Sequence, residues 1–173
     1  MDSTASRLCK ACGLCCTGVL FHTVRLQPSE SAQTFKALGM LLQHKKKYDF
    51  FNQPCTSFKE NCCSIYAQRP LRCKLFECQQ LKRLATGETT EVNALETILK
   101  AHHKVDQVQK LLQLSGPMNF KRPLSKQYAN VTAEPLDGSA GSEALALRSK
   151  LTEAFEDLNQ FLNHEFRNEE LSP

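Results

Sequence analysis

Several features that mark other classes of protein are absent from this sequence of 173 residues. No apolar run approaches the ~20 residues that a membrane-spanning helix needs, so no membrane association is expected. The first ten residues, MDSTASRLCK, contain no basic segment followed by an apolar run, and they therefore predict no secretory signal. No glycine-rich loop follows a predicted strand, although such a loop is the usual cradle of a nucleotide-like cofactor.

None of the nine cysteines lies beyond residue 78, so residues 79–173 contain no cysteine. The first four are spaced C-x2-C-x2-C-C over residues 9–16, and the other five are spread over residues 55–78. The odd count and the clustering argue against a secreted disulfide protein, whose cysteines tie distant segments together. The sequence therefore predicts a reducing, cytoplasmic setting in which the thiols are metal ligands or redox groups.

The charge is unevenly distributed along the chain. Residues 1–83 carry 13 Lys and Arg against 5 Asp and Glu, whereas residues 84–173 carry 9 against 13. A basic half is one indication of nucleic-acid binding, but no nucleic-acid motif and no alternation of aromatic and basic residues accompanies it. Four thiolates leave a net charge of about −2 on a zinc ion or on a [4Fe–4S] core. We interpret the basic half as compensation for that charge, and nucleic acid is not the expected partner.

The pattern of apolar residues predicts a small α+β protein that is mostly α-helical. Its first part, residues 1–86, is expected to be an irregular cysteine-rich metal-binding half with short strands. Residues 87–173 are expected to form a helical region that packs on it in one structural unit. Two long amphipathic helices are predicted over 90–114 and 142–168, because apolar residues recur there at steps of three and four. These helices are expected to cover the cysteine-rich half.

The remaining elements are predicted from turn residues and short apolar runs. Residues 1–8 are polar and are expected to be loose. Further predictions are a strand over 19–26, a helix from 28 to Gly39 or the lysine run that follows, a strand or ligand loop over 48–63, one helical turn over 65–68, a helix over 72–85 and a loop over 117–142.

Cysteines spaced two apart in a turn can both reach one metal ion, and thiolates suit zinc or iron. A lone C-x2-C would also fit a thioredoxin-like redox pair, but no strand–CxxC–helix context surrounds this one. Cys9, Cys12 and Cys15 match the start of the bacterial ferredoxin run, and the match ends because Cys16 follows at once. Structural zinc sites usually pair two C-x2-C knuckles, and the second segment has longer gaps. The uneven spacing favours an iron–sulfur centre over zinc, and it leaves open two centres of four cysteines or one cluster.

The segments CKACGLCC (9–16), QPC (53–55) and CSIYAQRPLRCKLFEC (63–78) together form a specific pattern. The chain resembles the CxxCxxCC cysteine-cluster family, YkgJ-type proteins described as zinc- or iron-chelating domains, over roughly residues 7–80. The resemblance implies a metal-binding protein that holds zinc or iron, with an iron–sulfur cluster as one form. The expected ligands are Cys9, Cys12, Cys15, Cys16, Cys55, Cys63, Cys73 and Cys78.

Two positions depart from the family pattern. Lys74 stands where the family favours arginine, and Cys62 is an extra thiol beside Cys63, so which of that pair ligates stays open. Between the expected ligands, Tyr66 and Arg69 suit either a supporting role around the metal or ordinary packing. Each histidine is expected to be a surface or packing residue, including His102 on the apolar face of its helix.

Three functions remain as alternatives at this stage. The leading one is binding of zinc or iron by the cysteine cluster. The second is an enzyme, either a redox protein or an iron–sulfur-dependent protein lysine methyltransferase, because the family is distantly similar to flagellin lysine-N-methylases. The third is an adaptor for a protein partner, in which zinc is purely structural. Whether the chain is an enzyme is left open.

Overall fold

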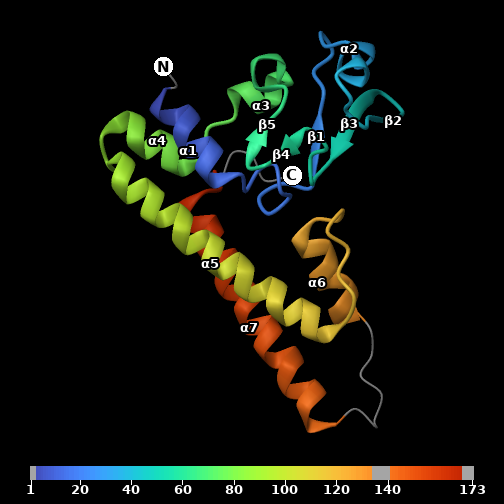
Figure 1. Cartoon of the computed structure of the whole chain (residues 1–173), viewed down its shortest axis with the longest axis vertical. Helices are drawn as coiled ribbons and strands as arrows, with labels where there is room; N and C mark the ends of the chain where they lie inside the picture. The colour runs from blue at the N-terminus through green and yellow to red at the C-terminus, as the bar shows by residue number, and fades with distance from the viewer. Residues whose placement is uncertain (1–2, 134–140, 169–173) are drawn as a thin grey trace.

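The computed structural model of the chain describes residues 3–133 and 141–168 (Figure 1). It confirms the predicted α+β class, with long helices and small antiparallel sheets. The helices are α1 (Thr4–Cys12), α2 (Ala32–Ala37), α3 (Leu71–Leu75), α4 (Gln79–Thr86), α5 (Glu91–Ser115), α6 (Leu124–Ala133) and α7 (Ser142–Glu165), with one 3₁₀ turn, η1 (Tyr66–Gln68). The strands are β1 (Thr23–Arg25), β2 (Gln43–Lys45), β3 (Tyr48–Asn52), β4 (Phe58–Lys59) and β5 (Cys62–Cys63).

The two long helices, α5 and α7, pack along each other and confirm the amphipathic helices that the sequence predicts. Thr90 caps the start of α5, because its hydroxyl oxygen accepts a hydrogen bond from the Asn93 amide at 3.2 Å. One stripe of each helix is buried, as expected from spacings of three and four residues. The stripes are Ala94, Ile98, Ala101, Val105, Val108 and Leu112 on α5, and Leu151, Ala154, Leu158 and Leu162 on α7.

This main core also includes residues from the N-terminal part of the chain. Leu8, Leu14 and Leu20 are each at most 7 % exposed and join the apolar stripes of α5 and α7. The cysteine-rich segment is therefore packed against the ends of the long helices, and α1 lies against α5 (Figure 1).

A second, smaller core lies under the three-stranded sheet. The sheet has the order β1-β3-β2 and is antiparallel, with Val24 opposite Phe51 and His44 opposite Asp49. The buried residues of this core are Leu26, Phe35, Met40, Phe51 and Ile65. Strands β4 and β5 form a separate two-stranded ladder in which Phe58 pairs with Cys63. The second core, with only these five buried apolar residues, contributes little stabilisation by itself.

The C-terminal end of α7 is joined to the segment around Cys78 by several hydrogen bonds. The amide of Gln79 donates to the carbonyl of Phe166 at 3.2 Å, and the side-chain amide of Asn168 donates to the carbonyl of Glu77 at 2.6 Å. The side chain of Gln80, 3 % exposed, donates to the carbonyl and the carboxylate of Glu165 at 3.0 and 2.8 Å. These bonds hold the helical cover on the cysteine-rich part.

Three local predictions were wrong. Residues 3–8 are not loose, because α1 begins at Thr4 after Ser3, whose hydroxyl accepts from the Ser6 amide at 3.2 Å, and residues 1–2 lie outside the described part. The predicted helix over 72–85 is broken at Phe76, whose backbone is extended and whose ring meets Phe21 edge-on at 4.7 Å. The predicted loop over 117–142 contains α6, which is held by buried Leu124 and Gln127, and its residues 134–140 lie outside the described part.

Two further boundaries differ from prediction. The strand expected over 19–26 shortens to β1, because the amides of Val19 and Leu20 bond to the carbonyl of Leu14 instead of a neighbouring strand. The helix from residue 28 begins only at Ala32 and ends before Gly39, whose φ of +83° does not continue a helix. Among the described helices, none is long and apolar enough to cross a bilayer.

Candidate metal centre

The nine cysteines come from six local structures and all carry free thiols. Cys9 and Cys12 lie on α1, and Cys15 and Cys16 lie in the turn that follows it. Cys55 follows β3, Cys62 and Cys63 form β5, Cys73 lies on α3, and Cys78 precedes α4 as its N-cap. Cys62 is exposed, whereas the eight cysteines predicted as ligands are half-buried.

Backbone contacts bring the two cysteine segments together. Gly13 ends α1 with φ +61°, and a Cβ there would lie 2.6 Å from the ring of Phe58, so only glycine lets β4 pack this closely. The chain then turns, with the amides of Cys16 and Thr17 donating to the Gly13 carbonyl at 2.9 Å. The amide of Cys55 donates to the carbonyl of Cys16 at 2.8 Å. This tight turn is therefore also the contact surface for the second segment.

Four of the thiols, which we name the first thiol group, act on one another through their charges. This group comprises Cys9, Cys12, Cys15 and Cys78. Burial raises the pKa of Cys12 to about 12, and the charges of Cys78 and Cys9 add to the increase. Burial raises the pKa of Cys15 well above its usual value, with the charges of Cys12, Cys16, Cys78 and Cys9 acting in the same direction. Sequence-distant Cys78 is thus a close neighbour of the α1 cysteines.

The remaining four expected ligands form the second thiol group. Its members are Cys16, Cys55, Cys63 and Cys73. Burial raises the pKa of Cys16 to about 12, helped by the charges of Cys55, Cys73 and Cys63. Burial likewise raises the pKa of Cys73 to about 12, and Cys55 and Cys63 add to it. The neighbours Cys15 and Cys16 therefore face largely different sets of thiols, as expected when adjacent side chains point apart.

Hydrophobic packing divides the cysteines in the same way. Cys12, Cys15 and Cys78 pack against the main core of α5 and α7. Cys55, Cys63 and Cys73 pack against the small core beneath the sheet. No group of three or more Cys, His, Asp or Glu side chains in residues 3–133 and 141–168 is placed so as to hold one metal ion. The packing thus places the thiols in two separate neighbourhoods, and among the described residues neither set of side chains is gathered closely enough to hold a metal ion.

The model of the CxxCxxCC family, described as "Putative zinc- or iron-chelating domain", matches residues 8–104, which is more than half of the chain. The chain belongs to the CxxCxxCC family. The match runs beyond Cys78 through α4 and into α5, farther than the resemblance over residues 7–80. No curated protein and no solved structure matches the chain. Membership supports a metal-binding function.

The donor chemistry of this CxxCxxCC domain fits a thiophilic metal. Backbone amides donate hydrogen bonds to several of the sulfurs and lower the pKa of these thiols. The amide of Leu14 does so for Cys12, although burial has the larger, opposite effect. Amides of Gln80 and Leu81 do the same for Cys78, and those of Ser57 and Phe58 for Cys55. Amides that donate to sulfur stabilise thiolate and recur around protein zinc and iron–sulfur sites.

Arg69 lies between the two thiol groups of the CxxCxxCC domain. Its positive charge lowers the pKa of Cys9 in the first group and of Cys16 and Cys73 in the second, in each case against the larger effect of burial. Its guanidinium lies 3.7 Å from the ring centroid of Tyr66, and its Nε donates to the Tyr66 carbonyl at 3.1 Å. The Tyr66 hydroxyl is 2.6 Å from Ser6 Oγ on α1. Tyr66 therefore packs against Arg69, and the charge of the same arginine acts on thiols of both groups.

The histidines are arranged mainly as surface or packing residues. His44 and His164 are exposed beside Asp49 and Glu165, respectively. His102 is half-buried and its Nε2 lies 3.2 Å from the carbonyl of Ala11, close to the end of α1. His22 instead lines a pocket with cations from residues 121–126. Sequence reasoning missed this pocket, because it placed those residues in a loop without a defined structure.

Proposed function

We propose that the eight expected cysteines bind metal in two centres of four thiolates each. The first centre would be held by Cys9, Cys12, Cys15 and Cys78. The second would be held by Cys16, Cys55, Cys63 and Cys73. The observation that carries this proposal is the different thiol surroundings of Cys15 and Cys16, which are adjacent in the chain. The packing of Cys12, Cys15 and Cys78 against one core, and of Cys55, Cys63 and Cys73 against the other, supports the same division.

The charge distribution of the protein supports bound thiolates. Two centres of four thiolates would each carry about −2 with either zinc or a [4Fe–4S] core. The surplus of Lys and Arg in residues 1–83 offsets that charge at long range, and Arg69 offsets it locally between the groups. A metal ion would replace the protons that now keep the buried thiols neutral, and it would cross-link segments that otherwise share little apolar contact.

Iron–sulfur is the form of metal that we favour. The cysteines come from helices, turns and a short ladder at irregular intervals, whereas structural zinc usually takes paired C-x2-C knuckles. Buried thiols with amide donors are also the surroundings that tune iron–sulfur clusters. Protein purified without oxygen should be brown and should lose its broad visible absorbance in air. Colourless protein with stoichiometric zinc would show that the centres are zinc sites.

The two alternatives from the sequence differ from this proposal in measurable ways. An iron–sulfur-dependent lysine methyltransferase would bind S-adenosylmethionine, and calorimetry on anaerobic protein would detect the heat of binding. An adaptor with structural zinc would contain zinc and would retain a protein partner in pull-downs only while the metal is bound. The metal-binding proposal itself requires neither result.

A further inference from the structure

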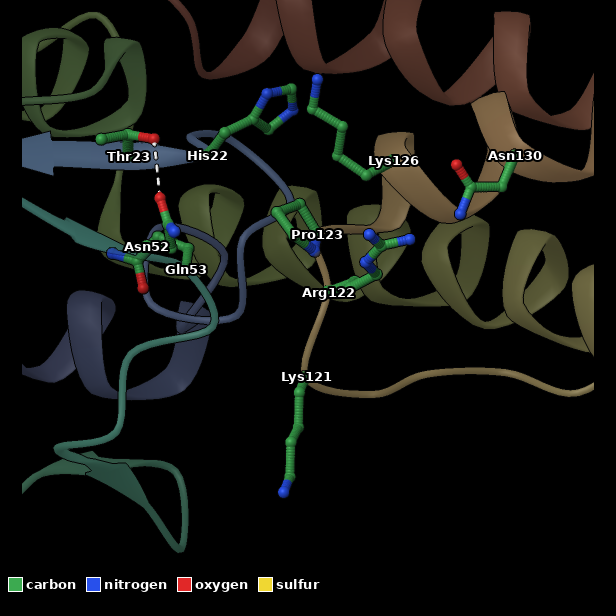
Figure 2. Close-up of a pocket in the computed structure, with 9 residues that line it drawn as sticks. All are labelled: His22, Thr23, Asn52, Gln53, Lys121, Arg122, Pro123, Lys126 and Asn130. Carbon is green, nitrogen blue, oxygen red and sulfur yellow. Dashed lines mark hydrogen bonds between the residues drawn. The ribbon is translucent and has the colours of Figure 1, made fainter. Parts of the chain in front are cut away.

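A pocket of about 410 Å³ lies between the three-stranded sheet and α6 (Figure 2). One wall comes from β1 and the end of β3, and the opposite wall comes from the segment before α6 and from α6 itself. The lining residues are His22, Thr23, Asn52, Gln53, Lys121, Arg122, Pro123, Lys126 and Asn130.

The charges around this pocket have one sign. Lys121, Arg122 and Lys126 line it, and no Asp or Glu does. Within the part of the chain that the structure describes, none of these three cations forms an ion pair. Elsewhere in the protein, Arg83 pairs with Glu165 and Lys104 with Asp157. Figure 2 shows Lys121 and Lys126 extending in different directions, so these unpaired cations lie along the rim of the hollow, and their combined positive field favours an anion there.

The basic segment is held in place by a buried side chain. Gln127 is 8 % exposed, and its Nε2 donates to the Arg122 carbonyl at 3.0 Å while its Oε1 accepts from the Asn119 amide at 3.1 Å. The Lys121 amide also donates to the side-chain oxygen of Asn119 at 3.0 Å. The backbone that carries Lys121 and Arg122 is therefore fixed before any ligand arrives, which lowers the entropic cost of binding.

One of the residues that line this pocket is buried and has a side-chain oxygen without a partner. Gln53 is only 3 % exposed, and its Oε1 has no hydrogen-bond partner among the described residues. Because the oxygen and nitrogen of a glutamine amide are interchangeable by rotation, this side chain can also present its NH₂ to a ligand. On the opposite wall α6 begins at Leu124, directly after Arg122 and Pro123, and a helix N-terminus favours negative charge.

The pocket adjoins the second thiol group through the backbone. Gly18, two residues after Cys16, has φ +80°, and a Cβ there would lie 3.1 Å from Gln53 Cβ and 3.4 Å from Pro123 Cα. The glycine therefore lets both walls of the pocket close on the cysteine-bearing turn. Gln53 is followed by Pro54 and then by Cys55, whose amide bonds to the Cys16 carbonyl.

We propose that this pocket binds a small phosphate-bearing anion, such as inorganic phosphate or a phosphomonoester. Arg122 and the two lysines supply the charge, and the Asn52, Gln53 and Asn130 side chains supply neutral donors at the edges (Figure 2). Thr23 and Asn52 already bond to each other at 3.1 Å and brace that wall. The inference is independent of the metal proposal, because none of the lining residues is an expected ligand.

The direct test is a titration of the full-length protein with inorganic phosphate, followed by amide chemical shifts in NMR spectra. Sodium chloride at matched ionic strength is the reference. We expect saturable shifts centred on residues 121–126 and on Asn52 and Gln53, and we expect chloride to leave these shifts unchanged. Shifts that do not saturate, or that are equal with chloride, would overturn the proposal.

A pair of double variants sharpens the test. Arg122→Gln with Lys126→Gln should weaken phosphate binding by about tenfold or more, since two charged donors are lost. Lys100→Gln with Lys150→Gln removes the same charge from exposed sites on α5 and α7, and it should leave the affinity unchanged. Equal losses in both double variants would contradict a defined site. Binding of a labelled single-stranded oligonucleotide without saturable phosphate binding would replace the small-anion proposal with a nucleic-acid surface.

Discussion

The backbone amide of Cys55 donates a 2.8 Å hydrogen bond to the carbonyl of Cys16. This bond joins residues 39 positions apart in the sequence and brings the start of the second cysteine segment to the last cysteine of the first. Cys15, one residue earlier, packs on the main core instead, and the charges of Cys12, Cys16, Cys78 and Cys9 add to the effect of burial in raising its pKa. The turn between Gly13 and Gly18 thus distributes two adjacent thiols to two neighbourhoods.

The ninth cysteine should not contribute to metal binding. Cys62 is exposed, and it is not among the thiols whose charges raise the pKa values of Cys16, Cys55 or Cys73. Cys62→Ser should therefore retain the full metal content, whereas Cys63→Ser should lose the metal of the second centre. Metal analysis of both variants checks this. If Cys62→Ser loses metal and Cys63→Ser does not, the assignment within this pair is reversed.

Arg69 should support metal binding without touching the metal. Its charge acts on thiols of both groups, and residues of this kind typically contribute 10–100-fold to metal affinity. We expect Arg69→Gln to lower metal affinity by about tenfold or more in competition with a chelator. Arg72→Gln removes an exposed arginine three residues away and serves as the control.

A structural role of Arg69 through Tyr66 is separated from the electrostatic one by Tyr66→Phe. This variant keeps the ring beneath the guanidinium and removes only the hydroxyl that lies 2.6 Å from Ser6 Oγ. It should leave metal affinity nearly unchanged. An equal loss in Tyr66→Phe and Arg69→Gln would show that Arg69 acts by holding α1 in place.

Glu165 should make the fold sensitive to acid. Burial acts to raise the pKa of its carboxyl, but hydrogen bonds and charges from His164 and Arg83 outweigh burial and lower that pKa. A lowered pKa means that the stabilisation is present at neutral pH and is lost as the pH falls through the folded-state pKa. Glu165→Gln should reduce the free energy of unfolding by about 1 kcal/mol at pH 7.

The pH dependence of this difference is the decisive part of the measurement. Thermal unfolding of wild type and Glu165→Gln should differ at pH 7 and converge below the pKa of the carboxyl, because both side chains are then neutral. Any loss of metal in acid affects both proteins equally. A difference that persists unchanged at pH 3 would mean that the charge of Glu165 is not what stabilises the end of α7.

The structural features that could be predicted from the sequence are those whose pattern extends over many residues. The helices α5 and α7 have 25 and 24 residues, with apolar residues recurring along each, so periodicity alone identified both helices. The cysteine spacing likewise identified eight candidate ligands. The separation of these thiols into two groups was not predictable, because it depends on the close contact of Gly13 with Phe58 and on Cys78 returning to α1.

The predictions of short helices were wrong for a different reason. Residues 1–8 look polar, yet Leu8 is 2 % exposed in the main core, and Arg7 pairs with Glu91 at the start of α5. Within residues 117–142, proline and glycine hid α6, whose stability comes from Gln127 and Leu124 in tertiary contacts. Tertiary packing overrides local preference in such short segments.

Loss of the second centre should loosen the sheet while leaving the long helices intact. Cys55, Cys63 and Cys73 pack on a core of only five buried residues, which is too small to be stable without cross-links. In Cys73→Ser, we expect faster hydrogen exchange of amides in β1–β3, with amides of α5 and α7 still protected. Equal loss of protection in the sheet and in both long helices would indicate one indivisible unit.

The central claim, two centres divided between Cys15 and Cys16, is tested most directly by metal and sulfide analysis of three anaerobically purified proteins. Wild type should contain two equivalents of the centre per chain. Cys15→Ser and Cys16→Ser should each retain about half of the metal, because each variant loses one centre and keeps the other. Complete loss of metal in both variants, or one equivalent in wild type, would contradict the two-centre account.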